Sequence, residues 1–186
     1  MRKLKISGIP GTALALFLAA SAGLSQPPPA GLVPLDELNL FPRDQLSVEV
    51  NLAGGMLHLI AAAAKDDPDF SALVAGLQSI NVQVFPLKGI KAESIKPKID
   101  HAVQWLEERG WKANVRVRDQ GQETFIYMKE QDGKIVGLTV LTFKPGDEAA
   151  VINIAGRIDP AQLGRLGKTL HVPQLEKMPA KGKKPQ

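Results

Sequence analysis

The clearest regularity along the chain is an alternation of apolar and polar residues, which predicts β-strands. Leu46–Leu52 alternates strictly and indicates a strand with one buried face, and Ile80–Phe85 indicates a second, shorter strand. Four closely spaced strands are predicted later, over Trp111–Arg118, Thr124–Glu130, Ile135–Phe143 and Ala149–Ala155. Because their connections are short, as at Asp132-Gly133, they are expected to form an antiparallel meander. The third of the four is apolar on both faces and is expected near the middle of the sheet.

Apolar residues at helical spacing predict four helices. The first covers Met56–Lys65, the second begins at Asp67, the third runs from about Ile95 to Arg109, and the fourth begins at Asp159. Asp67 and Asp159 suit the N-cap position because each is followed by a proline, which favours the first helical position. We therefore predict an α+β domain in which a largely antiparallel sheet of about six strands carries three to four helices on one face.

The two ends of the chain differ from the part between them. Residues 1–22 read as a signal peptide, because a positive start is followed by the apolar run Ala13–Ala20 and by small residues at Ala20-Ser21-Ala22. Residues 23–34 form a Pro-rich linker, 35–171 a single domain, and 172–186 a basic tail that we expect to be disordered. The protein is therefore predicted to be exported to the bacterial periplasm or cell envelope, with no transmembrane span after cleavage of the signal.

Charge and composition remove several classes of function. The chain has 186 residues, with 23 Lys+Arg against 19 Asp+Glu and no cysteine. Removal of the signal leaves 20 basic residues against 19 acidic ones, so the mature protein lacks the basic surface that nucleic-acid binding requires. Without cysteine there is no thiolate zinc site, iron–sulfur cluster, cysteine nucleophile or lipid-modified cysteine. The remaining basic excess lies in the tail, where Lys177, Lys181, Lys183 and Lys184 allow weak contact with anionic lipid.

The residues that could support catalysis or metal binding have ordinary structural explanations. His58, His101 and His171 have no metal-ligand spacing between them, and His58 is expected to be packed among apolar neighbours. The acidic cluster at Asp66-Asp67-Pro68-Asp69 suits a helix start and lacks the spacing of a calcium loop. We predict no metal, no cofactor and no catalytic residue. The alternative is a hydrolase or metal-dependent enzyme that uses Asp147, Glu148, Asp159 or His58.

One surface is a candidate binding site. In the alternation of Trp111–Arg118, the residues predicted to share the outer face are Lys112, Asn114, Arg116 and Arg118. A neighbouring strand would bring Phe125 and Tyr127 beside these cations, and arginine with aromatic residues is a combination enriched at interfaces. The candidate site for an anionic ligand, a lipid headgroup or an acidic envelope protein is thus Lys112, Asn114, Arg116, Arg118 and Tyr127. The competing explanation is a solvated sheet face whose arginine stems cover apolar surface.

Several motifs together resemble a known family. These are Gly110-Trp111 before an alternating strand, Asp147-Glu148 before Val151-Ile152-Asn153-Ile154, and Gly156-Arg157-Ile158-Asp159 before the last helix. They are similar to the bacterial family called domain of unknown function 4252, and the resemblance covers roughly residues 35–170. It implies export, in many members as apparent lipoproteins, and an envelope sensing or accessory role. It implies no activity and no catalytic residue, and the missing cysteine departs from the lipoprotein pattern.

The function predicted from the sequence is therefore an exported, non-enzymatic module that binds a ligand or a protein partner in the cell envelope. This prediction depends on the signal peptide, on the absence of catalytic motifs and on the basic strand face. The oligomeric state and the identity of the partner are not predicted.

Overall fold

A computed structural model of the chain describes residues 28–159 and has the predicted α+β class. The strands are β1 (Val48–Ala53), β2 (Leu77–Pro86), β3 (Lys112–Asp119), β4 (Gln122–Gln131), β5 (Lys134–Phe143) and β6 (Glu148–Ile158). The helices are α1 (Gly55–Ala63), α2 (Pro68–Gly76) and α3 (Ala92–Glu108), and two 3-10 turns, η1 (Leu35–Leu38) and η2 (Arg43–Gln45), precede β1. The predicted signal peptide, fourth helix and basic tail lie outside the described residues.

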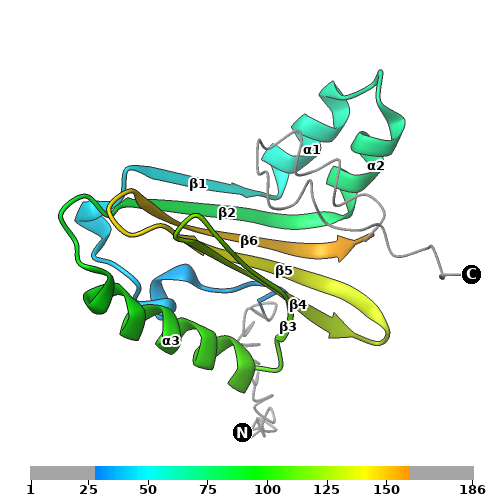
Figure 1. Cartoon of the computed structure of the whole chain (residues 1–186). Helices are drawn as coiled ribbons and strands as arrows, with labels where there is room; N and C mark the ends of the chain where they lie inside the picture. The colour runs from blue at the N-terminus through cyan, green and yellow to red at the C-terminus, as the bar shows by residue number, and fades with distance from the viewer. Residues whose placement is uncertain (1–27, 160–186) are drawn as a thin grey trace, which may run out of the picture.

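All six strands form one antiparallel sheet in the order β1-β2-β6-β5-β4-β3 (Figure 1). The predicted meander of the last four strands is confirmed. Its two tightest turns have the chemistry of two-residue hairpins, because Gln120-Gly121 and Asp132-Gly133 take positive φ at both central positions. In the strand order given above, β1 and β3 are the two edge strands. The apolar face predicted for β1 is only partly covered, with Val48 46% exposed.

Buried side chains form one cluster on each face of the sheet. On β5, Leu141 belongs to the cluster under α3, whereas Leu138 and Val140 belong to the cluster that includes α1 and α2. All three are fully buried, which confirms the prediction that this strand is central and apolar on both faces. The alternation of a strand therefore supplies both layers of the core.

The prediction that the helices share one face of the sheet is wrong. α3 packs on one face, and α1 and α2 pack on the other, near the end of β1 and the start of β2 (Figure 1). The order of the strands explains the division. α1 and α2 connect the neighbouring strands β1 and β2, so they stay at one end, whereas α3 must carry the chain from β2 to β3 at the far edge. Apolar stripes identify the helices, but they do not tell which face each helix covers.

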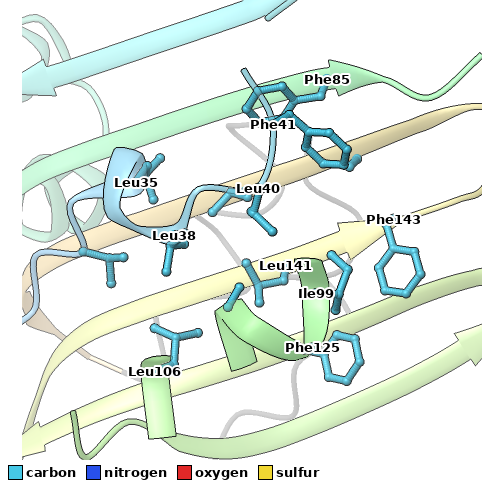
Figure 2. Close-up of a cluster of buried hydrophobic side chains, with 14 of the residues drawn as sticks. Leu35, Leu38, Leu40, Phe41, Phe85, Ile99, Leu106, Phe125, Leu141 and Phe143 are labelled. Atoms are coloured by element: carbon cyan, nitrogen blue, oxygen red, sulfur yellow. The ribbon is translucent and has the colours of Figure 1, made fainter. Parts of the chain in front are cut away.

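The segment before β1 fills much of the core beneath the sheet. Leu38 and Leu40 lie beside Ile99 and Leu106 of α3 and pack toward Leu141 of β5 (Figure 2). Val33, at the end of the expected Pro-rich linker, is 1% exposed, so this part of the linker belongs to the domain. The small and apolar residues of this part allow it to pack against the sheet. The prolines around them suggested an unpacked linker instead.

The helix signals read from the sequence have their expected roles. The main-chain N–H of Phe70 donates to Asp67 Oδ1 at 3.0 Å, which makes Asp67 the N-cap of α2, with Pro68 as its first residue. α3 buries the predicted stripe of Ile95, Ile99, Ala102 and Leu106, and Gly110 follows it with φ +74°. Among the described residues, no helix combines the length and apolar character needed to span a membrane.

Candidate functional site

The predicted cationic face of β3 is divided by a β-bulge. Ala113 pairs with Tyr127 and Val115 with Ile126, so Asn114 is an extra residue without a partner on β4. Beyond it the alternation is shifted by one position. Arg116 and Arg118 therefore lie on the α3 face, and Lys112 lies on the opposite face, across from Met128. The prediction that Lys112, Asn114, Arg116 and Arg118 share one face is wrong, because strict alternation does not continue through a bulge.

Arg116 and Arg118 converge on one carboxylate of the neighbouring strand. Glu123 faces Arg118 directly in the register and contacts both guanidinium groups, with Arg116 Nη2 3.5 Å from its Oε2. Its side chain is 18% exposed, whereas those of Arg116 and Arg118 are 65% and 69% exposed. The guanidinium of Arg116 also lies over the ring of Phe125, 4.7 Å from its centroid. A position of Phe125 beside the cations of this strand is what the alternation of the two strands predicts.

Tyr127 does not contribute to the exposed surface. It is 1% exposed, and its hydroxyl donates to Glu107 Oε1 on α3 at 3.1 Å. Burial, together with the negative Glu107, raises the pKa of Tyr127 from 10.0 to about 12. The prediction that Tyr127 belongs to the candidate binding site is therefore wrong, because its inward position on β4 makes it part of the core.

The remaining cation of the predicted face has a separate partner. Lys112 Nζ lies 3.5 Å from Glu130 Oε2, and both side chains are exposed. An exposed pair of this kind contributes little to stability. Lys112 thus lies on the other face of the sheet from the two arginines, and it pairs with Glu130 rather than with Glu123.

The carboxylates considered for catalysis do not meet in one place. Asp147 and Glu148 lie at the start of β6, and Asp147 Oδ2 is 3.2 Å from Lys144 Nζ in the preceding turn. Asp159 follows the other end of the same strand, which separates it from Glu148 by roughly 35 Å of extended chain. A substrate held by Asp147 and Glu148 therefore lies out of reach of Asp159.

The described histidines are on the surface. His101 is exposed on α3, as expected, and His58 on α1 is also exposed, so the prediction of a packed His58 is wrong. α1 turns Leu57 and Ala61 inward, which directs the intervening His58 outward. Within residues 28–159, no three histidine, aspartate or glutamate side chains are grouped so that they could hold a metal ion. His171 lies outside the described residues.

Sequence reasoning missed a buried polar residue at the centre of the sheet. Asn153 of β6 is fully buried, and its side-chain amide binds the main chain of the segment before β1. The available signal was its position: a lone asparagine within the apolar strand Val151-Ile152-Asn153-Ile154 must be satisfied by specific partners. Its role as a partner for Gly31 and Val33 could not be read from the sequence.

A second polar cluster lies where the same segment meets β1. Arg43 bridges two carboxylates, with its Nε 3.3 Å from Asp36 Oδ1 and its Nη2 2.9 Å from Glu49 Oε1. Hydrogen bonds from Asn51, which has the larger effect, and from Arg43 hold the pKa of Glu49 below its usual value. These residues line a concave surface between the N-terminal segment and the outer strands.

Comparison with known proteins identifies the family and nothing more specific. Neither a curated protein nor a solved structure matches the chain. The family model described as Domain of unknown function (DUF4252) matches residues 43–166, from η2 to beyond the end of β6. Because this match covers more than half of the 186 residues, the chain belongs to that family.

Proposed function

We propose that this protein is an exported, non-enzymatic binding module of the bacterial cell envelope, and that it receives an acidic partner at β3. The observation that carries the proposal is the sharing of Glu123 by Arg116 and Arg118. The pattern of residues 1–22 supports export.

Arg116 and Arg118 have positive charge and N–H donors that Glu123 does not use. Two guanidinium groups carry two positive charges against the single negative charge of Glu123, so one positive charge is uncompensated. Each guanidinium has five N–H donors in a planar fork that fits a carboxylate. Because both side chains are mostly exposed, an incoming carboxylate can reach them without displacing Glu123.

The edge position of β3 supplies a second means of recognition. Within the described residues β3 pairs only with β4, so its outer main-chain groups are available to an added strand. Cations along an edge oppose pairing with a second copy of the same edge, because like charges repel. An acidic extended segment would be attracted by the same side chains. We therefore infer that the partner presents acidic side chains on an extended chain.

The separation of the carboxylates that were considered for catalysis supports a non-enzymatic role. Asp147 and Glu148 lie at one end of β6 and Asp159 at the other. General acid–base catalysis needs such groups within hydrogen-bond reach of one substrate.

A crosslinking experiment in the bacterium that makes this protein tests the proposal. A photoreactive amino acid at Val117, which is 48% exposed on β3, should capture a protein partner in the envelope. The same amino acid at Leu59, which is 66% exposed on α1, serves as the control position.

The captured partner should be lost when Arg116 and Arg118 are both changed to glutamate, and it should remain when Lys112 is changed to glutamate. Capture that is equal at Val117 and Leu59, or that survives the double arginine change, contradicts the proposal. The thermal unfolding temperature of each variant shows whether the domain is intact.

A further inference from the structure

Three asparagines lie side by side on the α3 face of the sheet. In the register of the strands, Asn51 of β1 pairs with Asn81 of β2, and Asn81 pairs with Asn153 of β6. We call these three residues the amide row. Neighbouring strands are about 4.8 Å apart, so the row presents three side-chain amides at closely spaced positions. Each amide carries both donors and an acceptor.

Asn153 shows how a member of this row binds a peptide chain. Its Oδ1 accepts from the main-chain N–H of Val33 at 3.0 Å, and its Nδ2 donates to the main-chain oxygen of Gly31 at 3.0 Å. One amide thus satisfies the C=O of a residue and the N–H two positions further along. The two hydrogen bonds use main-chain groups only, but the segment lies so close to the sheet at Gly31 that a Cβ there would overlap the main-chain oxygen of Val136.

The other two members of the row face a cavity that extends beyond this contact. The cavity has a volume of about 160 Å³ and lies between Leu32–Asp36 and the strands β1 and β2. Asn51, which is exposed, and Asn81, which is half-buried, both line it. Asn51 donates to Glu49 Oε1 at 3.3 Å, and Asn81 makes no side-chain hydrogen bond within residues 28–159. Asn81 therefore has amide donors and an acceptor that no partner in residues 28–159 uses, and it lines this cavity.

An adjoining cavity adds apolar surface. It has a volume of about 330 Å³, at the lower end of the range for ligand pockets, and Phe41 and Phe85 line it together with Leu35 and Leu40. The two cavities share Gln83, which is 7% exposed, and the charged residues Asp36 and Arg43. With Glu49 the charged residues carry one net negative charge. The combined site suits a neutral or basic ligand with one apolar group.

We propose that Asn51 and Asn81 bind the main chain of a short, extended, neutral or basic peptide, in the way that Asn153 binds Gly31 and Val33. An apolar side chain of the peptide occupies the cavity lined by Phe41 and Phe85. The site is separate from the arginines of β3, and its negative charge selects against the acidic partner proposed there.

A titration followed by NMR tests this site directly. The probe is acetyl-Gly-Leu-Val-amide, a neutral peptide with the sequence that the domain already binds at residues 31–33. Addition of the peptide should shift the side-chain amide signals of Asn81, Asn51 and Gln83. Asn81→Ala should weaken the binding about fivefold, the effect of one lost hydrogen bond, and Asn114→Ala on β3 should leave it unchanged.

Three results would overturn the proposal. The first is an absence of shifts at Asn81 and Asn51 up to millimolar peptide. The second is a shift confined to Asn153, which would mean that the peptide replaces the N-terminal segment. The third is an equal response to N-acetylglucosamine, which would assign the site to the acetamido group rather than to a peptide chain.

Discussion

The hydroxyl of Tyr127 donates a hydrogen bond to Glu107 Oε1 at 3.1 Å and joins the middle of β4 to the end of α3. The contact places a phenol in the core with its polar group beside a carboxylate. Burial and the charge of Glu107 both disfavour the tyrosinate form, so they raise the pKa of the hydroxyl to about 12.

We predict that this pKa can be measured without interference, because Tyr127 is the only tyrosine in the chain. The absorbance of tyrosinate near 295 nm should rise with a midpoint near pH 12 in the folded protein and near pH 10 in urea. A folded-state midpoint near 10 would contradict the buried contact with Glu107. Tyr127→Phe should remove the signal altogether.

The same contact predicts a loss of stability at alkaline pH. The folded pKa is higher than the unfolded pKa, so the contribution of Tyr127 is fully present below pH 10 and is lost as the pH rises from about 10 to about 12. Its size is on the order of 2 kcal/mol. In urea unfolding experiments, the difference in stability between the wild type and Tyr127→Phe should shrink across that range. A stability difference that stays constant between pH 10 and pH 12 would contradict a raised pKa of Tyr127 in the folded protein.

Replacement of Asn153 should weaken the attachment of the N-terminal segment. In Asn153→Ala, the N–H of Val33 and the C=O of Gly31 lose their partner in a buried place, which should cost about 3 kcal/mol of unfolding free energy. Asn51→Ala, an exposed change in the same row, should cost less than about 0.5 kcal/mol. Equal effects of the two changes in urea unfolding would show that Asn153 has no special role.

The backbone contact next to Asn153 gives another prediction. A Cβ atom at Gly137 would lie 2.6 Å from the ring of Trp111 and 2.7 Å from the Cα of Gly31. Because backbone is present on one side, the strain cannot be relieved by a rotamer change, and Gly137→Ala should cost about 3 kcal/mol. Gly55→Ala, in α1 with open space around it, should stabilise the protein by about 0.5 kcal/mol. Thermal unfolding of both variants checks the contrast.

Local patterns in the sequence predicted the elements well because their causes are local. The cap at Asp67, the stripe of Ile95 and Ile99, and the turn at Asp132-Gly133 depend on neighbouring residues only. The face covered by each helix depends on which strands are neighbours, and that is a property of the whole sheet.

The candidate site was harder to predict for a related reason. The bulge at Asn114 arises from the pairing of two strands, and nothing in Lys112–Arg118 itself marks it. A single inserted residue moved Lys112 away from Arg116 and Arg118. One wall of the cavity that Asn51 and Asn81 line is formed by Leu32–Asp36. The prolines before and within this segment suggested a linker, so the sequence alone did not predict the cavity.

The central claim is that Arg116 and Arg118 form a surface for an acidic chain, and calorimetric titration with acetyl-(Glu)6-amide tests it most directly. Arg118→Glu should weaken the binding about tenfold, equivalent to about 1.4 kcal/mol, and added salt should weaken the wild-type binding. Lys112→Glu makes the same change of charge on the other face of the same strand and should alter the affinity less than about twofold. Equal losses in both variants would indicate a general charge effect, and no loss in Arg118→Glu would contradict the proposed surface.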